Sequence, residues 1–129
     1  HIMYSDNVSI LNDSFDRGIY LFDSFNNNVE DSYVDGKPIV YLEKQQEETI
    51  DSAGQVILVN CSNIIVDGLQ FRNTGVAIEA YASRNILIEN IAIYNVTRGV
   101  WLLNTNNSVV TNVTIIYSMH YSIYRRIYQ

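Results

Sequence analysis

The sequence contains one cysteine and one proline among its 129 residues. The lone Cys61 excludes an intramolecular disulfide and a cysteine-rich metal site. It fits a reducing compartment, or an exported protein that does not rely on disulfides. No apolar run approaches the ~20 residues that a membrane-spanning helix needs. The sequence therefore predicts a domain without a membrane span that depends on its own apolar core.

Positive charge is also scarce, because eight Lys and Arg face fourteen Asp and Glu and leave a net charge of −6. Such a chain repels phosphate backbones, so we expect no nucleic-acid partner. Long acidic polysaccharides are disfavoured too, unless a cation bridges the like charges. Apolar residues make up 47% of the chain, which excludes a disordered composition.

The length suits one compact domain. The first three residues, "HIM", are typical of a cloning remnant. We therefore expect residues 1–3 to be foreign and residues 4–129 to form a single domain, cut from a larger protein.

An evenly spaced repeat runs through the second half of the chain. "NIIVDGLQF" begins at Asn63, "NILIENIAI" at Asn85 and "NSVVTNVTI" at Asn107. "NVSILNDSF" from Asn7 fits the same frame, and "NNNVEDSYV" from Asn26 fits it more loosely. A period of about 22 residues is typical of a solenoid, in which each repeat is one coil stacked on the next.

The sixth position of each repeat predicts a corner. It is always a residue type that tolerates a left-handed backbone: Asn12, Asp31, Gly68, Asn90 and Asn112. The fourth and ninth positions are apolar and flank this corner, as two short inward-facing strands require. We also expect stacked corner asparagines to hydrogen-bond one another along the axis, as amide ladders do.

A third strand follows the two short strands of each repeat. It reads "GIYLFDS" from Gly18, "GQVILVNCS" from Gly54, "GVAIEAY" from Gly75 and "GVWLLNT" from Gly99. Three short strands per coil predict an all-β fold, a right-handed parallel β-helix of about five coils. The alternative is an antiparallel sandwich with regular strand spacing.

These coils resemble the NosD-type, carbohydrate-binding and sugar-hydrolase family of right-handed β-helices. "DGKPIVYLE" (Asp35 to Glu43) and "GQVILVNCSNIIVDGL" (Gly54 to Leu69) are similar to stretches of its exported, surface-type prokaryotic members. The resemblance implies an extracellular or cell-surface location, or a periplasmic one in a Gram-negative source. It implies no single activity, because the family includes copper-site maturation proteins, polysaccharide lyases, epimerases and surface-layer proteins.

Residues 35–53 break the repeat, and we expect an insertion there in the second coil. It is interpreted as a hairpin flap or as one wall of a ligand groove, with Lys37 and Tyr41 as binding residues. The outward positions of the third strands are too apolar to face water. They are predicted as Tyr20, Phe22, Ile57, Val59, Ala77, Glu79, Trp101 and Leu103. Cover by the insertion, a subunit interface, and an aromatic platform for sugar rings (Tyr20, Phe22, Trp101 and Leu103) remain open.

The chemistry expected from these residues is sparse. A carboxylate pair for glycoside hydrolysis could come from Glu79 and Asp23, or from Asp67 and Glu89. The arginines fall at coil corners, and the histidine, cysteine and methionine residues form no copper site on this geometry. We predict no metal and no cofactor.

The sequence thus favours a non-enzymatic β-helix module that binds glycans or protein partners. A polysaccharide lyase, epimerase or glycoside hydrolase domain is the alternative, and a copper-site maturation factor is less favoured. Neither end of the stack shows a capping helix, so we also expect a homodimer.

Overall fold

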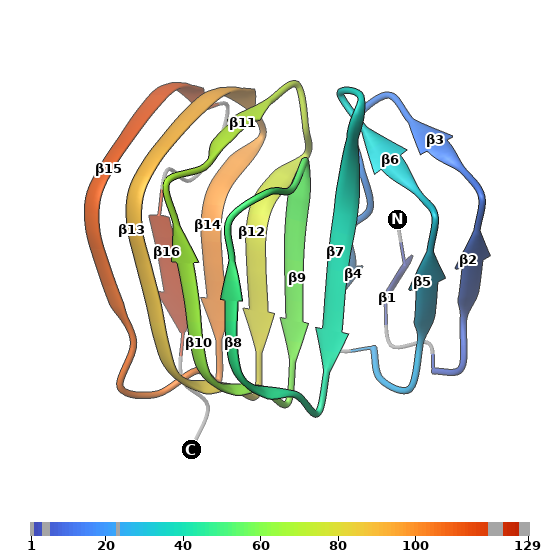
Figure 1. Ribbon diagram of the computed structural model, residues 1–129, viewed down its shortest axis with the longest axis horizontal. Coiled ribbons are helices and arrows are strands. Elements are labelled where there is room, and N and C mark those ends of the chain that lie inside the picture. The colour runs from blue at the N-terminus through green and yellow to red at the C-terminus, as the bar shows by residue number, and fades with distance from the viewer. Residues whose placement is uncertain (1, 4–5, 23, 119–122, 127–129) are drawn as a thin grey trace.

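The computed structural model describes residues 2–3, 6–22, 24–118 and 123–126 (Figure 1). These residues form strands and turns and no helix. The strands stack in parallel into a β-solenoid of about five turns, and equivalent corners of its central coils are 22 residues apart. The predicted all-β parallel solenoid is confirmed. No described helix is long and apolar enough to cross a bilayer.

Two sheets form the walls of the regular coils. The covered sheet contains β9 (Gln55–Val59), β12 (Val76–Tyr81) and β14 (Arg98–Leu103), followed by β16 (Ile123–Arg126). The open sheet contains β10 (Ser62–Asp67), β11 (Gln70–Arg72), β13 (Arg84–Val96) and β15 (Val109–Ser118). The register is regular, since Leu87 pairs with Ile65 on one side and Val109 on the other.

The segment 35–53 belongs to the stack, so the predicted insertion is wrong. Within it, β7 (Lys37–Glu43) pairs in parallel with β9, and β8 (Gln46–Ile50) pairs in parallel with β10. Val40 pairs with Val56, and Val56 pairs with Ile78 on its other side. The first of these two steps along the chain is the shorter one. Because this coil is shorter than its neighbours, a search for the regular period misses it.

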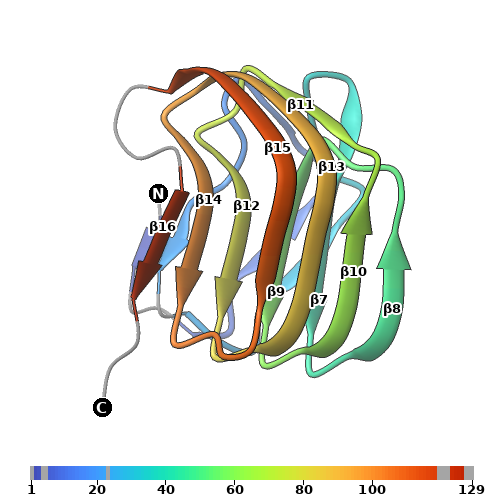
Figure 2. The same cartoon turned by 90° about the vertical axis from the view of Figure 1, so that its left-hand side faces the viewer.

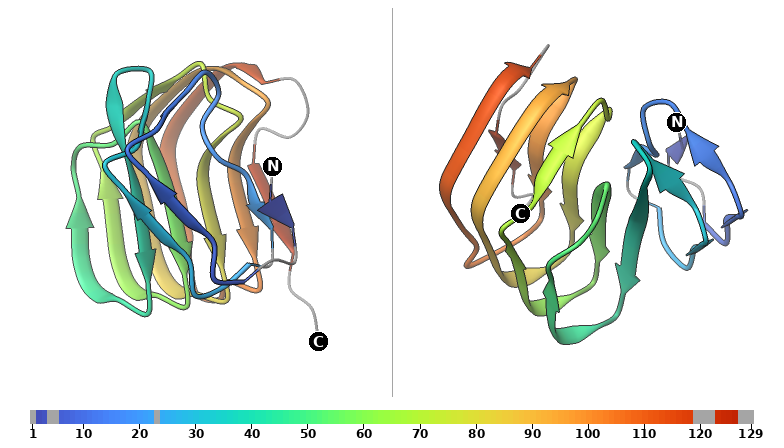
Figure 3. Two further views of the ribbon diagram at one scale, coloured as in Figure 1. Left: turned by 90° about the vertical axis from the view of Figure 1, so that its right-hand side faces the viewer. Right: turned by 45° about the horizontal axis from the view of Figure 1, so that its top comes forward.

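The N-terminal strands form two smaller coils of their own (Figure 3). They comprise β1 (Ile2–Met3), β2 (Ser9–Leu11), β3 (Ser14–Phe15), β4 (Leu21–Phe22), β5 (Asn28–Glu30) and β6 (Tyr33–Val34). Ser9 pairs with Asn28 and Ser14 with Tyr33, a step of 19 residues. The chain then reverses at Asp35 and Gly36, both at positive φ, and β6 pairs antiparallel with β7. Asp-Gly suits this two-residue hairpin turn.

The described residues form two apolar cores. One fills the stack between its walls and includes Val56, Ile88 and Phe71. The other lies between the outer face of the covered sheet and the N-terminal coils, where Ile57 and Trp101 pack with residues of the N-terminal coils. The predicted apolar column is therefore covered, but by the N-terminal coils and not by residues 35–53.

The membership of that column also needs correction. Ile57, Val59, Glu79, Trp101 and Leu103 do face outward from the covered sheet, whereas Ala77 belongs to the inner core. Tyr81 takes the outward position beside Leu103. Tyr20 and Phe22 lie outside this sheet, in the N-terminal segment at β4.

A covering segment, residues 17–21, is fixed to the covered sheet by buried polar groups. The Ile19 N–H donates to Gln55 Oε1 at 2.8 Å, and Gln55 Nε2 donates to the Ile19 and Val76 carbonyls. Gly18 has φ +76°, and a Cβ there would lie 2.6 Å from Gln55 Oε1. The covering segment can approach this closely only with glycine at position 18.

The predicted corners are confirmed. The five sixth-position residues all have positive φ, between 48° and 73°. Asn112 Nδ2 donates to Asn90 Oδ1 at 2.6 Å, and Asn90 Nδ2 donates to Asp67 Oδ1 at 2.9 Å. The expected amide ladder therefore runs along this edge of the stack.

Candidate functional site

The outer face of the open sheet is the broad wall that no other described segment covers. Its side chains form four columns across successive coils, because the register is constant. The columns are Ile65–Leu87–Val109, Asp67–Glu89–Thr111, Gln70–Ala92–Thr114 and Arg72–Tyr94–Ile116. Ile65, Val109 and Ile116 are 38%, 54% and 43% exposed, so the face combines apolar and polar columns in contact with water.

A shallow groove of about 280 Å³ runs across this face at the corner. It crosses three coils and is lined by Gly68, Leu69, Gln70, Asn90, Ile91, Ala92, Asn112 and Thr114. The Asn90–Asn112 ladder forms part of its wall. Ala92 between Gln70 and Thr114 leaves the middle of the groove low, since the flanking side chains are longer.

A second amide ladder lies on the far side of the groove. Asn95 Nδ2 donates to Asn73 Oδ1 at 2.8 Å, and both residues are exposed corners at positive φ. The nearby ring of Tyr94 is half-buried and carries the Arg72 guanidinium 5.0 Å from its centroid. The groove therefore lies between two rows of exposed amides, with a cation–π pair beside one of them.

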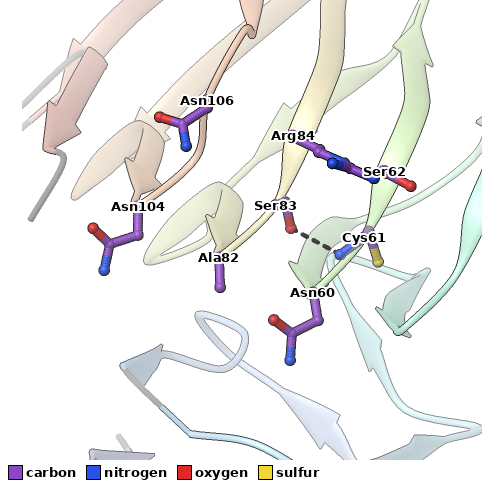
Figure 4. A pocket seen from close by; sticks show the side chains of 8 residues that line it. All are labelled: Asn60, Cys61, Ser62, Ala82, Ser83, Arg84, Asn104 and Asn106. Carbon is purple, nitrogen blue, oxygen red and sulfur yellow. Dashed lines mark hydrogen bonds between the residues drawn. The ribbon is translucent and has the colours of Figure 1, made fainter. Parts of the chain in front are cut away.

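A second hollow, of about 400 Å³, lies at another corner of the stack (Figure 4). Asn60, Ala82 and Asn104 stand side by side there at the ends of the covered-sheet strands. Ser83 and Cys61 follow Ala82 and Asn60 in the chain, and Ser83 Oγ accepts the Cys61 N–H at 3.1 Å. Burial raises the pKa of the Cys61 thiol, which donates to the Leu42 carbonyl at 3.3 Å. This cysteine is a structural group, and none of the residues lining the hollow supplies an activated nucleophile.

Glu79, a predicted catalytic residue, is fully buried under the covering segment. The Tyr81 hydroxyl donates to its Oε1 at 3.4 Å. Burial raises the pKa of this carboxyl group well above its usual range, although the Leu21 N–H, Tyr81 and the charge of Arg98 oppose the rise. Burial therefore favours the protonated, uncharged form of this side chain and shields it from any polymer. The prediction of Glu79 as an acid acting on a polysaccharide does not fit this position.

The residues predicted to bind a ligand do not form one surface. Trp101 and Leu103 are 8% and 4% exposed within the outer core, so they cannot offer a platform to a sugar. Tyr20 packs edge-on against Trp101, and Phe22 lies in β4. Elsewhere, Lys37 is exposed beside Asp51 in a small hollow. Tyr41 donates to Glu43 at 2.5 Å, and its pKa is raised by burial.

The second predicted carboxylate pair is brought together. Asp67 and Glu89 are register partners on neighbouring strands of the open sheet. Asp23 lies outside the described residues, as do Met119 and His120. Across the described part of the chain, no group of three or more His, Cys, Asp and Glu could hold a metal ion.

Sequence reasoning missed the ladder of Asn73 and Asn95. The signal was present, because these asparagines are also 22 residues apart, but they follow the repeat unit that defined the corners. No family model, no curated protein and no solved structure matches this chain.

Proposed function

We propose that this chain is a non-enzymatic β-helix module that binds a glycan in the groove between the two amide ladders. The observation that carries the proposal is the pair of ladders, Asn90–Asn112 and Asn73–Asn95, on either side of a shallow groove. Each amide is held by its neighbour, so its orientation is fixed before a ligand arrives. Such preorganisation lowers the entropy cost of binding.

The chemistry of the groove suits sugar hydroxyl groups. An asparagine amide offers two N–H donors and an acceptor, and a hydroxyl group can satisfy either. Coils stack ~4.8 Å apart, so the ladders repeat the same donor and acceptor pattern at regular intervals. Each ladder contains two asparagines, so a polymer with a short regular repeat can use the pattern twice along each ladder. Beside the groove, the Arg72 guanidinium over the half-buried ring of Tyr94 adds N–H donors for hydroxyl groups.

The charge of the module favours neutral glycans over acidic ones. Asp67 and Glu89 lie next to the groove, and the whole chain carries a net charge of −6. A polyuronate would be repelled unless a cation bridged the charges. The resemblance to NosD-type β-helices supports a location at the cell surface or outside the cell, as part of an exported protein.

Calorimetric titration with a panel of neutral and acidic oligosaccharides tests the proposal. Ala92→Trp fills the middle of the groove and should weaken binding at least about tenfold, equivalent to ~1.4 kcal/mol. Thr49→Trp adds the same side chain to an exposed position of β8, in register with Ile65 and away from the groove. This control should bind as the unaltered chain does. Failure of every neutral glycan to bind, or equal loss in both variants, would contradict the proposal.

The pairing of Asp67 and Glu89 favours one second candidate, a glycoside hydrolase. Two carboxylates on adjacent strands can lie at the short separation that retaining enzymes use. Incubation with the same glycans should then release reducing ends, and Glu89→Gln should abolish the release. Binding without any product supports the non-enzymatic module instead.

A further inference from the structure

The C-terminal end of the stack has a step. On the open sheet the last described strand is β15, which pairs with β13. On the covered sheet one more strand follows, because β16 pairs with β14 through Val100 and Ile123. Figure 2 looks onto this end and shows β15 and β16 at the front. In the described part of the chain, the covered wall is thus one strand higher than the open wall.

Among the residues that the structure describes, the apolar interior is incomplete at this end. Val110, Val113 and Ile115 pack against the inner core but remain only half-buried. Their counterparts one coil earlier, Ile88, Ile91 and Ile93, are at most 2% exposed. No other part of the described chain completes this layer of the core, as a further coil would.

The edge of β15 also lacks the protection that exposed strands normally carry. Residues 109–118 contain no charge, no proline and no glycine, and most are β-branched. The opposite edge of the open sheet is different, because β8 is shorter and exposes Glu47 and Glu48. Charged, short edges discourage pairing, whereas long uncharged ones invite it. The C-terminal end is therefore the end that is suited to a partner strand.

We propose that this end is the interface between two copies of the chain, related by a two-fold axis. The open wall bends at the Asn112 corner. The axis is perpendicular to the part of the wall formed by Val113–Ser118, so these residues pair antiparallel with the same residues of the other copy. The step at the end of each copy then lets the two copies fit together. Each β16 enters the space beside residues 109–111 of the other copy, and both open sheets continue through the interface.

The step decides between two ways of placing the axis. An axis through the corner at Asn112 would also pair the two β15 strands, but it would bring both β16 strands into the same space. The axis at Val113–Ser118 avoids this, because the high wall of one copy meets the low wall of the other. The surfaces are then self-complementary, as an isologous interface requires.

Light scattering on the purified chain, with a matched pair of variants, tests the interface. Ile116 and Ile65 are both exposed isoleucines of the open sheet, but Ile116 lies on β15 and Ile65 two coils away. Ile116→Lys places two like charges near the axis and should raise the dimer dissociation constant about tenfold or more. Ile65→Lys should leave it unchanged.

Hydrogen exchange provides a second readout that does not depend on a variant folding. In the unaltered chain, backbone amides of 113–118 should exchange more slowly as the protein concentration rises, while those of β8 should not change. A monomer at ~100 μM, where a dissociation constant near 1 μM would leave mostly dimer, would overturn the proposal. So would a dimer that survives Ile116→Lys, or one that Ile65→Lys also breaks.

Discussion

The rings of Tyr20 and Trp101 meet edge to face, with centroids 5.7 Å apart and planes at 73°. The Arg98 guanidinium lies over both rings, 5.4 Å and 4.2 Å from their centroids. Tyr20 belongs to the N-terminal coils and Trp101 to the covered sheet, so this contact joins two parts of the chain that differ in coil length. This packing also limits where ligands can bind, because the N-terminal coils cover the outer face of the covered sheet and leave the open sheet facing solvent.

Gly18→Ala should weaken the packing of the covering segment, residues 17–21, on the covered sheet. The added Cβ would lie 2.6 Å from Gln55 Oε1 and 2.7 Å from Thr74 Oγ1, and the residue has φ +76°. Overpacking and the left-handed backbone together should lower the free energy of unfolding by about 2–4 kcal/mol. Gly36→Ala is the matched control, since Gly36 has φ +72° and no atom within 4 Å of an added Cβ. It should cost only ~1–2 kcal/mol. Equal losses in a urea titration would show that the covering segment does not dock as described.

Asn90→Val should destabilise the corner by ~1–2 kcal/mol, because a β-branched residue is strained at φ +56°. Asn90→Gly removes the strain and loses only exposed hydrogen bonds to Asp67 and Asn112. It should therefore be tolerated, with a loss below ~1 kcal/mol. Denaturant titration of both variants measures the difference. A Val variant as stable as the unaltered protein would refute the corner.

Glu79→Gln should change how stability depends on pH. Burial raises the pKa of Glu79 in the folded state above its unfolded value near ~4.3. The folded protein thus holds a proton that the unfolded chain releases. The resulting stabilisation is complete below pH ~4.3 and is lost as pH rises through the folded pKa, at up to ~1.4 kcal/mol per pH unit.

The glutamine variant cannot ionise, so it should lose this slope and be more stable than the unaltered protein near pH 7. Unfolding titrations between pH 4 and pH 8 measure both effects. Glu89→Gln, at a partly exposed carboxylate of the open sheet, is the control and should leave the slope in place. An unchanged slope in Glu79→Gln would mean that Glu79 is not buried as a neutral acid.

The sequence predicts the parts of this fold that depend on local backbone preference. Asn90 and Asn112 reveal their corners because few residue types tolerate a left-handed backbone. The apolar outward column is also evident, since Trp101 and Leu103 are too apolar to face water. Which segment covers them depends on contacts between Tyr20 and Trp101, far apart in the chain. The reversal at Asp35–Gly36 and the changed coil length hide that contact from any search for a single period.

The candidate groove was harder to foresee for a related reason. Its walls are residues such as Gln70, Ala92 and Thr114, which have nothing in common except their register. Candidate residues chosen by chemical type fell instead on buried positions, as with Glu79. Side chains that are fully surrounded by the fold are conspicuous in the sequence, whereas a surface built from ordinary amides and small residues is not.

The most direct test of the binding proposal is nuclear magnetic resonance of the asparagine side-chain amides during titration with the tightest-binding neutral oligosaccharide. The signals of Asn90, Asn95 and Asn112 should shift with a common dissociation constant, because these amides line or flank the groove. Asn60 and Asn104, at the other corner of the stack, should not shift. Shifts confined to Asn60 and Asn104, or no shift at any of the five, would contradict a glycan site between the two ladders.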